Sequence, residues 1–424
     1  MWYHARGPRM PERRFLLISY FYPPHGGAGV QRALHLSRIA PSLGWEPVVL
    51  ASGQRGRTAV DRSLLSKVPE GVRVERTRAA VGFGTLFGAL PVDAYLGWLP
   101  FALRRLSAIL REERFDLVFS TSAPFTAHLL GDHARRALGV PWVADFRDPW
   151  TDNNFLPLYR GEGPIARMRQ RVDRRIEERV FAGADAVLVT ADPFRSLLVE
   201  RRGLPEGKVH LVRNGFDAED FAAPYAPRPD PGGRFRLLFA GNMYGDYNLA
   251  SVFRAADRLL SRRALPGFEL SIVSAAGAWA EREARKYPHL RPHLRVEKPV
   301  PHDQIVARYR DADALVLCAL DPLSTPGKLY EYIAAGPPVI AFVVPGTDAA
   351  LVLSRTGAGE AVPADDVELG ALSLERAYDR FRRGELPARC EDEIAKLTRQ
   401  AQVAEIVALF ERLAGERGAA SPRR

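Results

Sequence analysis

The sequence predicts an α/β fold made of two doubly wound parallel sheets in tandem. Short apolar runs alternate with helix-length amphipathic stretches, this alternation occurs in two successive series, and a Pro/Gly-rich stretch at 222–233 separates the series. Continuous apolar runs are typical of parallel strands buried on both faces. The 424 residues are enough for two domains of about 200 residues each.

The elements follow in order along both series. In the first, strands are expected at Phe15–Tyr20, Glu46–Ala51, Leu117–Ser120, Trp142–Asp145, Ala186–Thr190 and Val209–Val212, with helices at Ala28–Leu43 and Pro124–Leu138. In the second, strands are expected at Phe235–Ala240, Glu269–Val273, Leu294–Glu297, Ala314–Leu317, Val339–Phe342 and Gly359–Val362, with helices at Leu249–Arg263, His302–Arg310 and Pro326–Ala335. Glu391–Leu413 has the pattern of one long amphipathic helix.

This pattern predicts a domain organisation. We expect a first Rossmann-like domain at 1–221, a linker at 222–233, a second Rossmann-like domain at 234–390, and a C-terminal helix and tail at 391–424 that could pack back on the first domain. Ligands of such sheets bind outside the carboxyl ends of the strands. A cleft between the two domains is therefore the expected site.

Composition limits the class of protein. The net charge is +10, and only six of the 60 basic residues are lysines, so a lysine within a motif is conspicuous. Two cysteines exclude a disulfide scaffold and multi-cysteine zinc sites. Residues 1–14 are polar and basic, so no secretory signal is expected, and no run of about 18 apolar residues is present. We expect a cytoplasmic protein, with peripheral attachment to the inner face of the cell membrane as an extension.

The segment Val81–Leu110 has two interpretations. It is rich in aromatic residues and leucine and ends near several arginines. It can form helices that pack on the first domain, or it can form an interfacial membrane patch with a basic rim.

A glycine-rich turn follows the first strand. In Pro23-Pro-His-Gly-Gly-Ala-Gly-Val-Gln31, the glycines Gly26, Gly27 and Gly29 precede a helix expected to start near Ala28. Such a turn lets the backbone approach an anion at the helix start, although a tight structural turn has the same composition. Arg32 stands where a dinucleotide fingerprint needs its third glycine, so a standard NAD site is not expected.

A second motif is Ser324-Thr-Pro-Gly-Lys-Leu-Tyr-Glu-Tyr-Ile-Ala-Ala-Gly-Pro-Pro338. Thr325 fits an N-cap, and Pro326 fits the first helical position. Lys328 then falls in the first turn, where its ammonium and the unpaired helix N–H groups suit a diphosphate. Glu331 shares its face, so the pair can also be a surface salt bridge.

Four motifs together resemble glycosyltransferase family 4. They are the Pro326–Ile340 stretch, Tyr20-Phe-Tyr-Pro-Pro-His-Gly-Gly-Ala-Gly29, Asp145-Phe-Arg-Asp-Pro-Trp150 and Arg213-Asn-Gly-Phe-Asp217. They occur in the family's order across residues 15–410. The resemblance implies a GT-B fold and transfer of sugar from a nucleoside diphosphate sugar, usually with retention and without a metal or other cofactor.

The resemblance also assigns donor-binding residues. Glu331 matches the family's ribose-binding glutamate, and Lys328 matches the lysine that approaches the donor phosphates. The resemblance places Gly26, Gly27 and Gly29 over the diphosphate. It places Ser324 and Thr325 against the sugar and diphosphate, and Gly241 and Asn242 at the start of a further donor-side loop.

The sequence departs from the family pattern in three places. Leu323 replaces a second glutamate, the loop 241–248 has no arginine or lysine, and no histidine lies beside Ser122-Ala-Pro124.

The expected catalytic residues are Lys328, Glu331, Asp145, Arg147 and Asp148. Charge develops on the leaving phosphate, so a fixed cation and helix dipoles would stabilise the transition state. Asp145 or Asp148 could deprotonate the acceptor hydroxyl, or both could form a buried ion triad with Arg147. The resemblance implies a further alternative, in which the donor phosphate itself takes that proton.

Other polar residues have structural explanations. His25 and His128 can face the cleft, but lone histidines are usually structural. Asp185, Asp311 and Asp313 precede strands and are expected to fix turns, so no metal site is expected.

The leading hypothesis is transfer to a saccharide or lipid-linked acceptor in polysaccharide or cell-envelope biosynthesis. The alternatives are a nucleoside diphosphate sugar epimerase of the same fold and a non-catalytic sugar-nucleotide or nucleic-acid-binding protein. Nucleic acid is not an expected partner, because the basic residues are scattered among acids.

Overall fold

The computed structural model describes residues 13–53, 60–80, 92–153, 163–223, 225–226, 233–243 and 248–420. The chain forms two compact units, one of residues 1–213 and 400–424 and the other of residues 214–399. The chain enters the second unit after Arg213, ahead of the 222–233 stretch in which a linker was expected, and leaves it after Arg399. Most of that stretch lies outside the described residues.

The first unit contains a seven-stranded, wholly parallel sheet with the order β3-β2-β1-β4-β5-β6-β7. Its strands are β1 (Arg13–Ser19), β2 (Trp45–Ser52), β3 (Arg73–Thr77), β4 (Leu117–Thr121), β5 (Trp142–Phe146), β6 (Ala186–Val189) and β7 (Val209–Leu211). The order reverses between β1 and β4, and ligands of doubly wound sheets bind at such a switch point.

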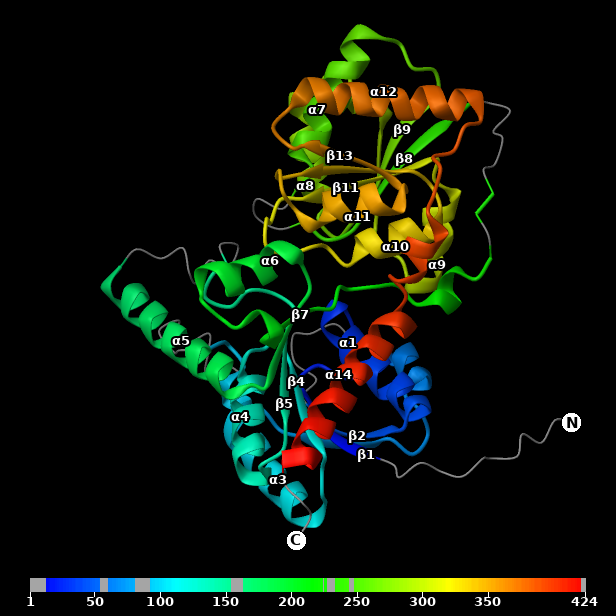
Figure 1. Cartoon of the computed structure of the whole chain (residues 1–424). Helices are drawn as coiled ribbons and strands as arrows, with labels where there is room; N and C mark the ends of the chain where they lie inside the picture. Colours follow the sequence, from blue (N-terminus) through cyan, green and yellow to red (C-terminus); the bar gives the residue numbers. More distant parts are fainter. Residues whose placement is uncertain are drawn as a thin grey trace, which may run out of the picture. The chain divides into compact units, whose positions relative to one another are not determined.

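Helices cover both faces of this sheet (Figure 1). They are α1 (Ala28–Ile39), α3 (Leu99–Glu112), α4 (Thr126–Leu138), α5 (Pro164–Gly183), α6 (Asp192–Ser196) and α14 (Arg399–Ala420), with short 3-10 or π segments η1 (Ala40–Leu43), η2 (Arg62–Lys67), η3 (Leu96–Trp98), η5 (Leu197–Arg201) and η6 (Glu206–Lys208).

The C-terminal helix α14 completes the core of the first unit. The Phe410 ring lies 5.2 Å from the rings of Phe15 and Trp45. The Trp45 indole Nε1 donates to Glu411 Oε1 at 2.7 Å. Sequence-distant α14 therefore covers one face of β1, β2 and β4.

The second unit contains a six-stranded parallel sheet with the order β10-β9-β8-β11-β12-β13. Its strands are β8 (Phe235–Ala240), β9 (Phe268–Val273), β10 (Leu294–Glu297), β11 (Ala314–Ala319), β12 (Val339–Val343) and β13 (Gly359–Pro363). Its helices are α7 (Ala250–Arg262), α8 (Gly277–Glu283), α9 (His302–Asp311), α10 (Lys328–Ala335), α11 (Asp348–Thr356), α12 (Val367–Arg383) and α13 (Glu391–Ala395), with 3-10 segments η7 (Ala218–Phe221), η8 (Ala284–Lys286) and η9 (Arg291–His293).

Two expectations about strands were wrong. The edge strand β3, Arg73-Val-Glu-Arg-Thr77, was missed because its charged sequence contains no apolar run. Strand β9 is not buried on both faces: Phe268, Leu270 and Ile272 are in one core, whereas Glu269 and Ser271 line a groove on the other face. β9 pairs with both β10 and β8, and its residues alternate because its second face lines the groove instead of a core.

The expectation of one helix over Glu391–Leu413 was also wrong. The helix is interrupted at Lys396–Thr398, between α13 and α14. There the Phe216 N–H donates to the Leu397 carbonyl at 3.2 Å, and the Arg399 N–H donates to the Phe216 carbonyl at 2.9 Å. These backbone bonds replace the helical ones where the chain leaves the second unit.

The segment Val81–Leu110 lies partly outside the described residues, which resume at Val92. Helix α3 buries Ala102, Leu106 and Ile109 on one face, while Phe101 is 42% exposed. Packing on the first unit therefore accounts for the described helix. No helix among the described residues is long and apolar enough to cross a membrane.

Candidate functional site

The glycine-rich loop of the first unit ends at Gly27, which caps α1 with φ of +87°. A Cβ there would have open space around it, but the positive φ favours glycine. At Gly29, by contrast, a Cβ would lie 2.9 Å from Cδ2 of Phe21. Gly29 is therefore needed for packing, whereas Gly27, with the half-buried Gly26 beside it, leaves the helix start open to an anion.

Asp145 lies at the carboxyl end of β5 and is fully buried. Its register partner Thr121 donates from Oγ1 to Asp145 Oδ2 at 2.7 Å. Arg32 Nε lies 3.7 Å from the same oxygen, and Asp145 Oδ1 has no hydrogen-bond partner among the described residues. Thr121 and Arg32 thus both contact Oδ2 of the carboxylate, and Oδ1 has no hydrogen-bond partner among the described residues.

Arg147 makes no hydrogen bond to Asp145 among the described residues, although the charges of both Asp145 and Asp148 act on it. Its guanidinium donates to the carbonyls of Ser122 at 2.5 Å and Ala28 at 2.8 Å. Burial lowers the pKa of Arg147, while the nearby Asp148 and Asp145 carboxylates raise it. Arg147 therefore connects the loop after β5 to the first residue of α1, which brings two of the sequence motifs together.

Arg32 is a residue whose role the sequence did not reveal. It is 3% exposed, and its Nη2 donates to the carbonyls of Val212 at 2.8 Å and Arg213 at 3.3 Å. It therefore joins α1, β5 and the Arg213–Asp217 motif. Its position, at the site of the missing third glycine, was the available signal.

The two histidines are structural. His128 is fully buried, its Nδ1 lies 2.8 Å from Ser120 Oγ, and burial lowers its pKa to about 3. His25 is 4% exposed, and burial also lowers its pKa. Both imidazoles are therefore enclosed by their unit, as expected for structural histidines.

The second unit places Lys328 at the first position of α10, beside the end of β8. Its Nζ donates to the Ala240 carbonyl at 2.6 Å. A Cβ on Gly241 would lie 3.1 Å from this Nζ, so a larger residue there would crowd the ammonium. Burial lowers the pKa of Lys328, while the nearby Glu331 raises it. The ammonium is thus held by a neutral carbonyl at the start of a helix.

Two tyrosines support this cation and Glu331. The Tyr332 hydroxyl accepts from the Ala240 N–H at 2.9 Å, which holds the carbonyl that Lys328 uses. The Tyr309 hydroxyl donates to Glu331 Oε2 at 3.4 Å, and the two tyrosine rings are 4.9 Å apart. The sequence analysis missed both roles. The spacing of Lys328 and Tyr332, four residues apart, was the available signal for Tyr332.

The loop before α10 differs from the prediction. Gly327, not Thr325, is the N-cap, and no side chain caps the helix. Asp321 instead accepts from the Leu323 N–H at 3.0 Å and from Ser324 Oγ at 2.6 Å. Thr325 is 5% exposed, and its buried Oγ1 has no hydrogen-bond partner among the described residues. In the first turn of α10, the Leu329 N–H donates to the Pro326 carbonyl at 3.0 Å and the Tyr330 N–H to the Gly327 carbonyl at 3.3 Å, and no side chain caps the helix near the exposed Asn242.

Two of the aspartates before strands bind N–H groups at the start of neighbouring strands, whereas a role in their own turns was expected. Asp185 Oδ2 accepts from the Trp142 N–H, and Asp313 Oδ2 accepts from the Arg236 N–H, both at 2.8 Å. Among the described residues, no group of three or more His, Cys, Asp or Glu side chains could hold a metal ion.

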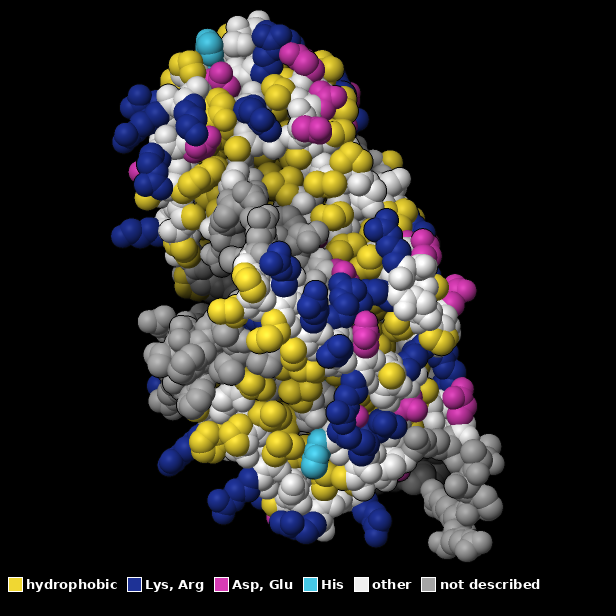
Figure 2. All heavy atoms as spheres, turned by 90° about the vertical axis from the view of Figure 1, so that its left-hand side faces the viewer, with side chains coloured by type: hydrophobic (Ala, Val, Ile, Leu, Met, Phe, Trp, Pro, Cys, Tyr) yellow, Lys and Arg dark blue, Asp and Glu magenta, His cyan; other side chains and the backbone are white. Residues whose placement is uncertain are grey.

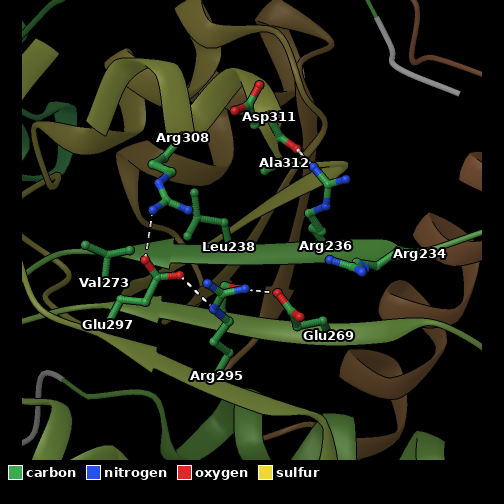
Figure 3. A pocket seen from close by; sticks show the side chains of 11 residues that line it. Arg234, Arg236, Leu238, Glu269, Val273, Arg295, Glu297, Arg308, Asp311 and Ala312 are labelled. Carbon is green, nitrogen blue, oxygen red and sulfur yellow. Dashed lines mark hydrogen bonds and ion pairs between the residues drawn. The ribbon is translucent and has the colours of Figure 1, made fainter. Parts of the chain in front are cut away.

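A groove of about 190 Å³ lies on the open face of β8, β9 and β10, beside α9 (Figure 3). Leu238 and Val273 form part of its apolar floor. Glu297 accepts from Arg295 at 2.9 Å and from Arg308 at 3.0 Å, so much of its charge is compensated internally. None of the donor-motif residues lines this groove.

Family models match both halves of the chain. The Glycosyl transferase 4-like domain matches residues 26–215, and Glycosyl transferases group 1 matches residues 234–379. The two matches contain the glycine-rich loop and the Lys328 motif, respectively.

Individual proteins are similar over long stretches. The chain is 28% identical over 264 residues to the D-inositol 3-phosphate glycosyltransferase of Arthrobacter sp. (strain FB24), which covers 58% of each protein.

Two solved structures superpose on nearly the whole chain. The sucrose-phosphate synthase of Thermosynechococcus elongatus has a TM-score of 0.66, with 17% identity, 95% of this chain and 100% of that chain covered. HepE of Anabaena, solved with UDP and glucose, has a TM-score of 0.63, with 14% identity, 93% of this chain and 99% of that chain covered. These likenesses and the two parallel sheets establish a two-domain GT-B fold.

Proposed function

The chain belongs to the glycosyltransferase family built from the 4-like and group 1 domains, and from this premise we propose that it transfers a sugar from a nucleoside diphosphate sugar to a hydroxyl acceptor. The proposed transfer proceeds with retention and without a metal ion. The acceptor is a saccharide or lipid-linked molecule of polysaccharide or cell-envelope biosynthesis. The protein is cytoplasmic, with peripheral attachment to the membrane.

One observation carries the donor assignment. The Lys328 ammonium lies at an uncapped helix N-terminus and is held only by a carbonyl among the described residues. A diphosphate placed there would receive a cation, helix N–H groups and the open Gly241 backbone together. The UDP in the HepE structure supports a nucleoside diphosphate as this ligand.

Glu331 is proposed to bind the ribose hydroxyls. Because Tyr309 donates to Oε2, Oε1 is oriented for an acceptor role toward a ligand. The unpartnered Thr325 hydroxyl is proposed to bind the sugar or diphosphate, with Ser324 and Asn242 beside it.

In the proposed reaction, Lys328 and the α10 dipole stabilise the charge that develops on the leaving diphosphate. Loss of one preorganised donor of this kind costs roughly 3–4 kcal/mol. The glycine-rich loop before α1 is proposed to supply further N–H groups. Asp145, Arg147 and Asp148 are proposed to act on the acceptor side, where the free Oδ1 of Asp145 can accept a hydroxyl proton or hydrogen bond.

Calorimetry with UDP-, GDP- and ADP-sugars tests the donor site. One donor should bind, and Lys328→Ala and Glu331→Ala should each weaken its binding by about 10- to 150-fold, in line with the loss of a hydrogen bond to a charged group, about 1.5–3 kcal/mol. Lys286→Ala and Glu385→Ala are matched controls in the same unit, because both side chains are exposed surface ion-pair partners.

Two results would contradict the proposal. Equal donor affinity in the wild type and both site variants would remove the donor assignment. Conversion of the bound donor to an isomerised sugar without any acceptor would identify the epimerase alternative.

A further inference from the structure

Helix α5 of the first unit carries its charges inward. Arg169, Asp173 and Glu177, spaced four residues apart, are 6%, 0% and 1% exposed. Asp173 accepts from the Val92 N–H at 2.6 Å and pairs with Arg169 Nε at 3.3 Å. Glu177 accepts from the Thr151 N–H at 3.2 Å. The helix is therefore fixed to its unit by polar contacts along its inner face.

The outer face begins with two apolar side chains. Ile165 and Met168 are 63% and 62% exposed, more than any other large hydrophobic side chain of the described residues. They are three residues apart and so share a face in the first turn. Figure 1 shows α5 at the margin of its unit, with its N-terminal end away from the strands. The usual amphipathic pattern is inverted at this end of the helix.

Arg171 and Arg175 follow on the same side of the helix as Met168. Arg167 projects nearly opposite Ile165, and the acidic Glu178 is also exposed. Arg167, Arg171 and Arg175 are exposed and form no ion pair among the described residues. By contrast, Arg174 and Arg179 each pair with an aspartate, at 3.2 and 3.4 Å. Figure 2 shows hydrophobic and basic side chains side by side on the face where α5 lies.

We propose that this outer face of α5 docks on an anionic phospholipid surface. Ile165 and Met168 would enter the headgroup region, and Arg171 and Arg175 would contact lipid phosphates. A second copy of the chain is a poorer occupant, because a two-fold contact would bring like-charged arginines together. This surface locates the membrane contact on α5 rather than on Val81–Leu110. The proposed docking of α5 on a membrane does not depend on the proposed sugar transfer.

Vesicle flotation tests the docking surface. The wild type should float with phosphatidylglycerol-containing vesicles and not with phosphatidylcholine vesicles, and binding should weaken as salt rises. Ile165→Gln/Met168→Gln should reduce binding at least about tenfold. Leu372→Gln is the matched control, because Leu372 is 46% exposed on α12 of the other unit and should leave binding unchanged.

Replacing the arginines separates the electrostatic contribution to vesicle binding from that of the inserted apolar side chains. Arg171→Gln and Arg175→Gln should each weaken vesicle binding about fivefold, corresponding to about 1 kcal/mol per basic residue near an anionic surface. Donor binding without vesicles should be unchanged in all four variants, which also shows that they are folded. This readout keeps the two proposals distinguishable.

Three results would overturn the inference. In the first, the wild-type protein does not bind anionic vesicles. In the second, the α5 variants bind these vesicles as well as the wild type does. In the third, the wild type sediments as a dimer and the α5 variants as monomers, which would make the outer face a dimer contact.

Discussion

The two units share a strand order but hold their buried cations differently. In the first, Arg32 faces the Asp145 carboxylate and also donates to two carbonyls. In the second, Lys328 donates to the single carbonyl of Ala240. Arg32 is thus paired with a buried carboxylate, although its Nε and Nη1 lack hydrogen-bond partners among the described residues. Lys328 is hydrogen-bonded to a carbonyl, and Glu331 acts on it only as a nearby charge. A buried cation that no carboxylate contacts directly is the better candidate for an anionic ligand, since more of its charge remains available.

The largest expected effect is on stability at Arg32. Arg32→Ala leaves Asp145 buried without its cation, so the free energy of unfolding should fall by about 3–5 kcal/mol. Lys328→Met removes one hydrogen bond to a carbonyl and should cost only about 1 kcal/mol. Urea denaturation followed by circular dichroism measures both. Equal losses would contradict the contrast between the units.

A second effect is on the pH dependence of donor binding. The pKa of Lys328 is lowered by burial, so its ammonium should lose its proton below the ordinary lysine value of 10.5. Donor affinity in the wild type should therefore fall as pH rises through that lowered pKa. Lys328→Met should bind weakly with no such fall.

The same group should affect stability with the opposite sign. Between the lowered pKa and 10.5 the unfolded chain binds more protons than the folded one, so the contribution of Lys328 to stability rises with pH. Calorimetric titration and denaturation over one pH series test both signs. If the affinity of the wild type for the sugar donor stays constant up to pH 10.5, the Lys328 ammonium does not bind that donor.

The smallest expected effect concerns Tyr309, which positions Glu331. Tyr309→Phe removes a hydrogen bond to a carboxylate, so donor affinity should fall about fivefold, or about 1 kcal/mol. Tyr378→Phe is the control, because its buried hydroxyl donates to the Pro266 carbonyl away from the motif. Both variants should lose similar stability, and only Tyr309→Phe should weaken the donor. An equal loss of donor affinity in both variants would show that Tyr309 has only a structural role.

Local sequence signals were sufficient for most helices and strands. Lys328 and Glu331 could be assigned to the start of one helix from the sequence alone, because Pro326 limits where that helix starts and Gly336 limits where it ends. The cap itself was misassigned to Thr325, because the side chain of Asp321 organises the preceding loop instead. Competition between two nearby polar side chains cannot be read from spacing alone.

The exceptions occur where the tertiary context overrides local pattern. β3 forms at a sheet edge because β2 offers a partner, although its own sequence is charged. The break between α13 and α14 arises because Phe216 supplies backbone hydrogen bonds to residues far along the chain.

Periodicity, caps and glycine positions in the chain are enough to identify two parallel α/β units, their motifs and the family resemblance, since these signals act within a few residues. The partners of the charged groups depend on folding. Arg32 meets Asp145, Lys328 meets Ala240, and α5 turns its charges inward because parallel strands and crossover helices bring distant segments together. The choice between a compensated and an available charge is made by those long-range contacts, since Coulomb and hydrogen-bond energies act over a few ångströms in space rather than along the sequence.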